Sequence, residues 1–341
     1  MALSDTELYL QKHLGIKLLR GTDDAIQVQR ASTGLIGLDL ELGGGLGLGR
    51  VVEIWGEAGL GKTSLVLHWI AQWQRRHWPV FFADLEHSMD PHLFAIHEVD
   101  PDQIHFLKSA VDDEPLWGED LLTAFKVLPP AYPHALFVVD SVATMVPKSS
   151  IPSKDPEGMF GGRIGSTASL LSTGLKWLVG SGVLANHQAT LVLINQVRST
   201  LNSYGPSSEP TGGKASKFFA SYRLEIRRGQ VYEDAQKRRI GHELAVHIQK
   251  NKTGDAYSTV IIPLIYGSGF HVGMDAVNTA VQLGVVERKG AWFAWEEDRV
   301  KAQGQEKFLT ALQADPALWS EFYQAVRDAV RAALGGIEVI P

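Results

Sequence analysis

Eight residues of the sequence, GEAGLGKT (56–63), follow the pattern G-x-x-x-x-G-K-[ST], which is suited to holding phosphate groups. Glycines let the backbone curl so that its amides face phosphate oxygens, and the helix expected next adds the partial positive charge of its first turn. In this phosphate-binding loop (P-loop), Lys62 would reach the β- and γ-phosphates of a nucleotide and Thr63 would ligate Mg²⁺. A plain glycine turn is the alternative, which the preceding strand VVEIW and the following helical pattern disfavour. The predicted phosphate-binding residues are Gly56, Glu57, Ala58, Gly59, Leu60, Gly61, Lys62, Thr63 and Ser64.

Two further apolar runs are followed by carboxylates that suit nucleotide hydrolysis. The run ALFVVDS (135–141) places Asp140 at the C-terminal end of a buried strand, where a carboxylate can serve Mg²⁺ beside a P-loop. In PVFFADLE (79–86), Glu86 lies just past a strand end, where it can orient or deprotonate the water that attacks the γ-phosphate. For Glu86 a solvated turn acid is the alternative, and Asp84 is the rival carboxylate.

The run LVLINQ (191–196) ends at Gln196 and leads into a polar segment rich in Gly, Pro and Ser, residues 198–213. Gln196 can hydrogen-bond the γ-phosphate or the attacking water, and loss of the γ-phosphate could then change the position of this segment. The alternative is an amide that only caps the strand, and for the residue taken alone this alternative is favoured. The segment exceeds a tight turn of about two to five residues. Its amides and few cations can follow a phosphate backbone without reading bases, and a disordered surface loop is the alternative.

Short, nearly continuous apolar runs predict the strands that position these residues. Strands apolar on both faces indicate a central sheet covered by helices, and helical patterns between the first four runs indicate parallel α/β units. The later runs have shorter connections, which predicts hairpins. The runs are VVEIWG (51–56), PVFFADLE (79–86), ALFVVDS (135–141), LVLINQ (191–196), YRLEIRR (222–228), LAVHIQK (244–250) and VIIPLIY (260–266).

The chain of 341 residues is longer than a single core usually fills, so a large domain with smaller parts is expected. Residues 1–30 predict a short helix and a linker, and residues 31–270 predict the α/β core. Residues 271–341 predict a small C-terminal α/β domain that ends in the helix ALWSEFYQAVRDAVRAAL.

The composition indicates a soluble, globular chain. Hydrophobic residues make up 45% and charged residues 21%, and no apolar run approaches the ~20 residues of a membrane span, so no membrane partner is expected. The lack of cysteine excludes disulfides and Cys-based zinc sites and agrees with a cytoplasmic location. A net charge of -6 argues mildly against a nucleic-acid binder, although Lys148, Lys154 and Arg163 give one loop a local positive bias.

Together, the P-loop, Glu86, Asp140 and Gln196 resemble the ATP site of the RecA family of homologous recombinases. The resemblance extends over further segments in the family's order, from about residue 31 to residue 332. It implies a RecA-type P-loop NTPase core with a mostly parallel central sheet flanked by helices, plus a short N-terminal helix and a small C-terminal α/β domain. The segments are STGLIGLDLELGGGLGLGRVVEIWG, EHSMDP, VVDSVATMVPK, INQVR, TGGKASKFFASYRLEIRR, KNKTG and GAWFAWEEDRVKAQGQEKF.

The resemblance implies two DNA-binding loops, at about residues 151–165 and 198–213. Single-stranded DNA and a homologous duplex are the implied partners, and single-strand-binding or mediator proteins are further candidates. The residues predicted to bind DNA are Arg163, Arg198, Tyr204, Gly212, Gly213 and Lys214.

The resemblance also implies contacts between protomers. Lys250 and Lys252 match lysines that reach the ATP of the neighbouring subunit, and Phe218 matches an aromatic residue at the subunit interface. Asp90 and Tyr266 match residues near the nucleotide. The N-terminal helix matches an element that docks onto the next protomer, and such head-to-tail contacts propagate as a helical filament.

The implied function is an ATP-dependent DNA recombinase that polymerises on single-stranded DNA with ATP and Mg²⁺, pairs it with homologous duplex and exchanges strands. A RecA-fold ring helicase or a RadA-like branch-migration ATPase is the alternative, and the lack of cysteine disfavours the RadA-like protein, which carries a cysteine zinc finger. A non-catalytic regulator is a third hypothesis, which the intact P-loop and carboxylates disfavour. Leu93 stands where the family has an adenine-stacking tyrosine, and the chain ends in LGGIEVIP without a long acidic tail, which predicts a divergent member such as one carried by a phage or plasmid.

Overall fold

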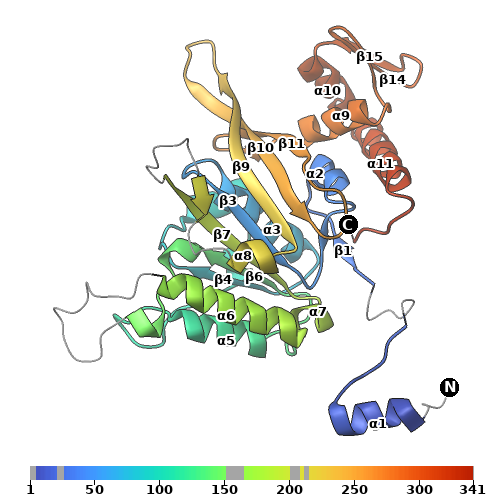
Figure 1. The fold of residues 1–341 in the computed structure, drawn as a ribbon. Helices are drawn as coiled ribbons and strands as arrows, with labels where there is room; N and C mark the ends of the chain where they lie inside the picture. The colour runs from blue at the N-terminus through green and yellow to red at the C-terminus, as the bar shows by residue number, and fades with distance from the viewer. Residues whose placement is uncertain (1–4, 21–26, 151–164, 200–207, 211–214, 341) are drawn as a thin grey trace.

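A ten-stranded sheet runs through the molecule and positions the residues that are predicted to do chemistry (Figure 1). The computed structural model describes residues 5–20, 27–150, 165–199, 208–210 and 215–340. The strand order is β12-β11-β10-β9-β3-β7-β6-β4-β5, and β8 pairs with β7. The strands are β3 (Val51–Gly56), β4 (Val80–Asp84), β5 (Ile104–Phe106), β6 (Leu136–Asp140), β7 (Thr190–Ser199), β8 (Ser208–Pro210), β9 (Tyr222–Glu233), β10 (Arg239–Asn251), β11 (Thr259–Ile265) and β12 (Gly269–Phe270).

The centre of the sheet is parallel and one flank is antiparallel. β3 pairs in parallel with β7 and β9, and β6 pairs in parallel with β4 and β7. The strands from β9 to β12 follow one another as antiparallel neighbours. Both the mostly parallel sheet and the later hairpins that the apolar runs predict are therefore confirmed.

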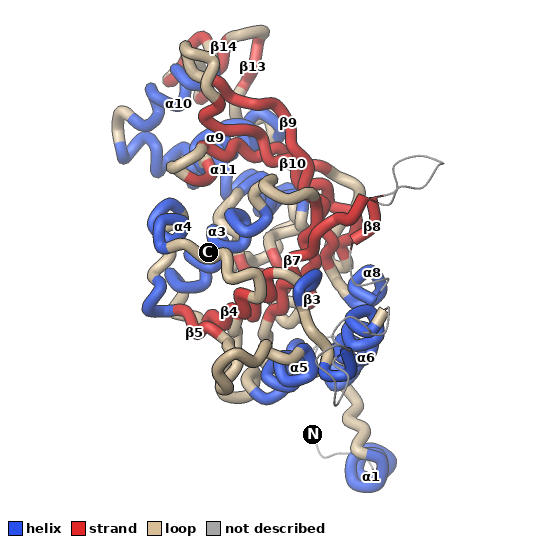
Figure 2. The backbone as a smooth tube through the Cα atoms, turned by 90° about the vertical axis from the view of Figure 1, so that its left-hand side faces the viewer, coloured by secondary structure: helices blue, strands red, loops and turns tan. Residues whose placement is uncertain are grey.

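Helices cover both faces of the sheet, which explains why the apolar runs are continuous (Figure 2). Val52 and Ile54 of β3 point into one buried cluster, whereas Val51 points into the other. Because successive side chains of a strand face opposite sides, a strand buried on both faces needs apolar residues at nearly every position. The helices of the first face are α2 (Ile36–Glu41), α3 (Lys62–Arg75) and α4 (Pro91–Ile96), and those of the second are α5 (Gly118–Val127), α6 (Ser166–Ser181), α7 (Val183–Asn186) and α8 (Ala215–Phe219).

Strand β7 is longer than the run LVLINQ predicts. It continues beyond Gln196 to Ser199, and its end pairs with the antiparallel strand β8, with Arg198 opposite Glu209. The predicted end of the strand at Gln196 is therefore wrong, and residues 198 and 199 belong to the strand rather than to a loop. The pairing with β8 holds the polar end of β7 extended, and a strand stabilised in this way needs no apolar sequence.

A small C-terminal α/β domain follows the core, as the fold prediction expects. It consists of three α-helices and a three-stranded antiparallel sheet. Their buried cluster includes Phe308 and Phe322, and Ile36 of α2 joins it from the core. The elements are α9 (Val272–Gln282), β13 (Glu287–Lys289), β14 (Trp292–Trp295), β15 (Val300–Gln303), α10 (Gln305–Gln313) and α11 (Pro316–Ala333).

The N-terminal helix α1 (Asp5–Leu14) lies away from the sheet in both views (Figures 1 and 2). None of its residues is buried, and Leu8, Tyr9 and Leu14 are exposed. The short strands β1 (Arg30–Ala31) and β2 (Leu46–Gly47) flank α2 and pair with each other, and Ala31 and Leu46 belong to the buried cluster of the first face. Within the described ranges, the chain has no helix with the length and apolar character needed to span a membrane.

Candidate active site

The P-loop connects the end of β3 at Gly56 to the start of α3 at Lys62, as the sequence predicts. Two of its positions require glycine. A Cβ on Gly56 would lie 2.4 Å from the carbonyl oxygen of Ile226, and one on Gly61 would lie 2.9 Å from Leu264. Gly61 also has a φ of 97°, in the left-handed region where glycine has no steric penalty. The loop can therefore turn tightly against the sheet.

Lys62 lies folded over the P-loop. Its Nζ donates to the carbonyl oxygens of Gly56 at 3.0 Å and Glu57 at 2.6 Å, and the residue is buried. Burial lowers the pKa of Lys62, and the carboxylates of Asp140 and Glu86 oppose that effect. The ammonium group thus lies between two backbone carbonyl oxygens of the loop, at a place where it could also bond a phosphate oxygen.

Asp140 and Thr63 meet beside the P-loop. The Thr63 hydroxyl donates to Oδ2 of Asp140 at 2.8 Å, and Asp140 is buried at the end of β6. Burial raises the pKa of Asp140 to about 6, although the hydrogen bond from Thr63 acts in the opposite direction. A hydroxyl and a carboxylate at this distance form a small, hard oxygen donor set.

The geometry separates the two rival carboxylates, Glu86 and Asp84. Asp84 accepts hydrogen bonds from the backbone amides of Ser88 and Met89, each at 3.1 Å, so it stabilises the turn after β4. Glu86 instead lines the cavity beside the P-loop. Asp84 is therefore occupied with local structure, and Glu86 is the carboxylate available to a ligand.

Gln196 contacts Glu86 directly. Its Nε2 donates to Oε1 of Glu86 at 2.6 Å, and the Ser141 hydroxyl donates to the same oxygen. In the sheet, Gln196 lies opposite Gly56, the first residue of the P-loop. The amide is thus bonded to a side chain in the segment that follows β4, whereas a plain strand-capping amide would bond only backbone groups near the end of its own strand.

These side chains surround a cavity of about 380 Å³ at the C-terminal ends of the parallel strands. Residues of α4 and of the turn between β11 and β12 form its other wall, and Tyr266 there is 50% exposed. Parallel α/β sheets bind ligands at this edge. The lining residues are Ala58, Gly59, Gly61, Lys62, Thr63, Ser64, Glu86, Leu93, Ile96, His97, Asp140, Gln196, His242, Leu264, Ile265, Tyr266, Gly267 and Gly269.

Asp90 is not among the residues that line this cavity. Its carboxylate accepts the amide of His92 at 2.8 Å and caps the N-terminus of α4. Leu93, on the same helix, does line the cavity. An apolar side chain therefore lines the cavity at the position where the resemblance would place a stacking tyrosine.

Lys250 and Lys252 lie at the opposite end of the sheet from the P-loop. Lys250 pairs with Arg223 in the sheet, whereas the P-loop residue Gly56 pairs with Ile226 further along β9. Nζ of Lys250 donates to the carbonyl oxygens of Lys217 and Phe218, at 2.9 and 3.1 Å. The structure therefore does not bring these lysines to the cavity beside the chain's own P-loop.

Several predicted DNA-binding residues lie outside the described residues, as does most of both predicted loops. Of Arg198, only the backbone position on β7 is described. The predicted residues outside the description are Arg163, Tyr204, Gly212, Gly213 and Lys214.

His242 is a site residue that the sequence did not single out. It is 1% exposed, lines the cavity, and contacts both Leu60 and Tyr266. It precedes the apolar run 244–250 and lies on the same buried side of β10 as Leu244 and Val246. A polar residue on an otherwise apolar strand face was the available signal.

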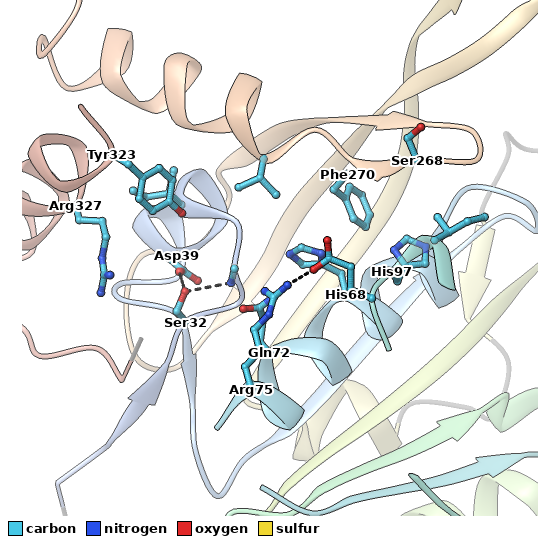
Figure 3. A pocket seen from close by; sticks show the side chains of 15 residues that line it. Ser32, Asp39, His68, Gln72, Arg75, His97, Ser268, Phe270, Tyr323 and Arg327 are labelled. Atoms are coloured by element: carbon cyan, nitrogen blue, oxygen red, sulfur yellow. Dashed lines mark hydrogen bonds and ion pairs between the residues drawn. The ribbon is translucent and has the colours of Figure 1, made fainter. Parts of the chain in front are cut away.

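A second cavity of about 430 Å³ lies between α2, α3 and the C-terminal helix α11 (Figure 3). His68 and Tyr323 both line this cavity. Burial lowers the pKa of His68 to about 4 and raises the pKa of Tyr323 to about 12. His97 lines this cavity as well as the first. None of the predicted site residues lies in its lining.

Comparison with known proteins agrees with this geometry. The family model of the RecA N-terminal domain matches residues 1–271, and that of the RecA C-terminal domain matches residues 274–331. Protein RecA of Chloroherpeton thalassium is 37% identical over 311 residues, covering 90% of this chain and 83% of the relative. Protein RecA of Fusobacterium nucleatum is 33% identical over 334 residues, covering 96% and 84%. The chain therefore belongs to the RecA family of recombinases, which are DNA-dependent ATPases.

Proposed function

We propose that the cavity beside the P-loop binds ATP with Mg²⁺, and that its hydrolysis controls a recombinase filament on DNA. The observation that carries this proposal is the convergence of Lys62, Thr63, Asp140 and Glu86 on one cavity at the C-terminal ends of β3, β6 and β4. These are the group types that phosphoryl transfer requires: a cation, two oxygen donors for a metal and a water-activating carboxylate.

The P-loop amides and Lys62 would hold the β- and γ-phosphates. The bonds of Lys62 to the Gly56 and Glu57 carbonyls would then be exchanged for bonds to phosphate oxygens. The Thr63 hydroxyl and the Asp140 carboxylate are hard oxygen donors in contact, which fits Mg²⁺. When bound there, Mg²⁺ would neutralise the charge of the phosphates.

Glu86 would act as the general base. Among the described residues only its Oε1 accepts hydrogen bonds, from Gln196 and Ser141, so Oε2 is left to accept a proton from water. The two donors fix the plane of the carboxylate, and fixed orientation is what a general base needs.

Gln196 would connect the ATP site to DNA. It bonds Glu86 at one end, and it lies on β7 immediately before the paired end of that strand and the predicted second DNA-binding loop. Loss of the γ-phosphate would change the partners of Gln196 and so the position of the loop, an order–disorder switch of a known kind.

Filament assembly would use the opposite end of the sheet. Phe218 is 66% exposed and Lys250 bonds its carbonyl, so an apolar ring and a cation lie together on one surface. Such a surface can contact the nucleotide edge of the next protomer. The contribution of mediator proteins and the location in the cell stay predictions of the sequence.

ATP hydrolysis with and without single-stranded DNA, paired with a strand-exchange assay, tests the proposal. Lys62→Ala should abolish ATP-dependent assembly on DNA, and Glu86→Gln should keep ATP binding but stop turnover. Asp84→Asn is the matched control, because Asp84 bonds only turn amides among its described contacts. Hydrolysis that single-stranded DNA does not stimulate, or normal turnover in Glu86→Gln, contradicts the proposal.

A further inference from the structure

A buried histidine joins the P-loop to the aromatic residue at the edge of the nucleotide cavity. Nε2 of His242 lies 3.2 Å from the carbonyl oxygen of Leu60, and Nδ1 lies 3.1 Å from the hydroxyl oxygen of Tyr266. The ring is 1% exposed and belongs to the cavity lining. One side chain therefore spans two walls of the cavity that are far apart in the sequence.

The partners determine which ring nitrogen carries the proton. A carbonyl oxygen only accepts hydrogen bonds, so Nε2 of His242 must carry the hydrogen and donate to Leu60. In the neutral imidazole Nδ1 then has a lone pair, which accepts the hydroxyl hydrogen of Tyr266. The bonds form a chain with one direction, from the Tyr266 hydroxyl through the imidazole to the P-loop carbonyl, and bonds in such chains strengthen one another.

This chain fixes both cavity walls. In a trans peptide the carbonyl and the following N–H point in opposite directions, so holding the Leu60 carbonyl also sets the direction of the Gly61 amide. That peptide needs an anchor, since Gly61 has access to more backbone conformations than other residues. At the other end, the bonded hydroxyl fixes the ring of Tyr266, which is otherwise half exposed.

We infer that His242 is a positioning residue, which holds Tyr266 and the P-loop in the relative position that binds ATP. The inference rests on the proposed ATP site. Under this inference His242 does not contact the reacting atoms, so replacing His242 should weaken ATP binding more than it slows the chemical step. The inference also requires that His242 and Tyr266 act through each other.

The test is the ATP dependence of hydrolysis stimulated by single-stranded DNA. The chains compared are the wild type, His242→Phe, Tyr266→Phe and the double variant. Each single variant should raise KM for ATP about fivefold to tenfold, the effect of a lost hydrogen bond, with kcat within about twofold. The double variant should be no worse than His242→Phe, because both changes break the same chain. His247→Phe is the matched control, since His247 lies on the same strand and bonds Thr259 away from the cavity.

An unchanged KM in His242→Phe, a loss confined to kcat, or multiplying effects in the double variant would overturn the inference. If His242→Phe does not fold, Tyr266→Phe decides, because it removes only the hydroxyl and leaves a half-exposed ring in place. A wild-type chain that does not hydrolyse ATP overturns the proposed function and this inference together. If the wild type hydrolyses ATP and Tyr266→Phe has the same KM for ATP, this inference alone is overturned.

Discussion

Replacing Gln196 by alanine should weaken the dependence of DNA binding on the nucleotide state. The change removes the 2.6 Å hydrogen bond from Nε2 to the Glu86 carboxylate. A hydrogen bond to a charged group contributes about 1.5–3 kcal/mol, and each 1.4 kcal/mol is about a factor of ten. Coupling free energies between sites are typically about 1–3 kcal/mol. Loss of this one bond can therefore remove most of the coupling, a drop of about tenfold to a hundredfold.

The measured quantity is the ratio of two dissociation constants for a labelled single-stranded oligonucleotide. One is taken with ADP and the other with a slowly hydrolysed ATP analogue, by fluorescence anisotropy at one salt concentration, because salt alone changes such affinities. Gln249→Ala is the matched control: Nε2 of Gln249 donates to Glu225 at 2.7 Å, a similar pair in the same sheet but outside the cavity lining.

Two results would refute this reasoning. One is a ratio in Gln196→Ala equal to that of the wild type, which would show that the bond to Glu86 does not couple the nucleotide state to DNA binding. The other is an equal fall in Gln249→Ala, which would show that the loss of any Gln–Glu pair in the sheet has this effect. A fall in Gln196→Ala alone supports the proposed coupling.

The remaining predictions concern stability and assembly. Burial holds the pKa of His68 at about 4, below its ordinary value of 6.5, so the folded chain favours the neutral ring and loses stability as the pH falls. Between about pH 7 and about pH 5, the wild type should lose about 2 kcal/mol of unfolding free energy relative to His68→Asn. Urea unfolding of both chains at each pH measures this difference, and parallel pH profiles of the two chains would contradict the prediction. Phe218→Asp should shorten filaments in electron micrographs while leaving the melting temperature within about 2 °C, because the ring is 66% exposed. Tyr257→Asp, at an 81% exposed ring, is the control, and equal shortening there would contradict a specific interface.

The sheet was predictable because its strands are buried on both faces. Such burial demands continuous apolar runs, and β3, β4, β6 and β11 coincide closely with the runs in the sequence. β8 was not predictable, since Ser208–Pro210 has no apolar pattern and is a strand only because the end of β7 pairs with it. Its existence depends on a tertiary contact that local sequence does not record.

The site was predictable where it is local and less so where it depends on distant contacts. The P-loop lies within eight consecutive residues, so its pattern identifies it. Glu86 and Asp84 lie at the same strand end, and only the amides of the turn distinguish their roles. His242 bonds Leu60, a residue 182 positions away in the sequence, so a search by spacing could not find it.

The register of β3 with its neighbours explains how Gln196 is kept in place. Gly56 lies opposite Gln196 on β7, and earlier on β3 the fully buried carboxylate of Glu53 accepts from Asn195 at 3.2 Å and Arg223 at 2.6 Å. A slip of one residue turns every side chain of a strand to the other face. It would separate Gln196 from Glu86 and would also separate the buried carboxylate of Glu53 from Asn195 and Arg223, its donors on the two neighbouring strands, which is a costly change. The buried ion pair therefore opposes the slip that would disconnect β7 from the ATP site.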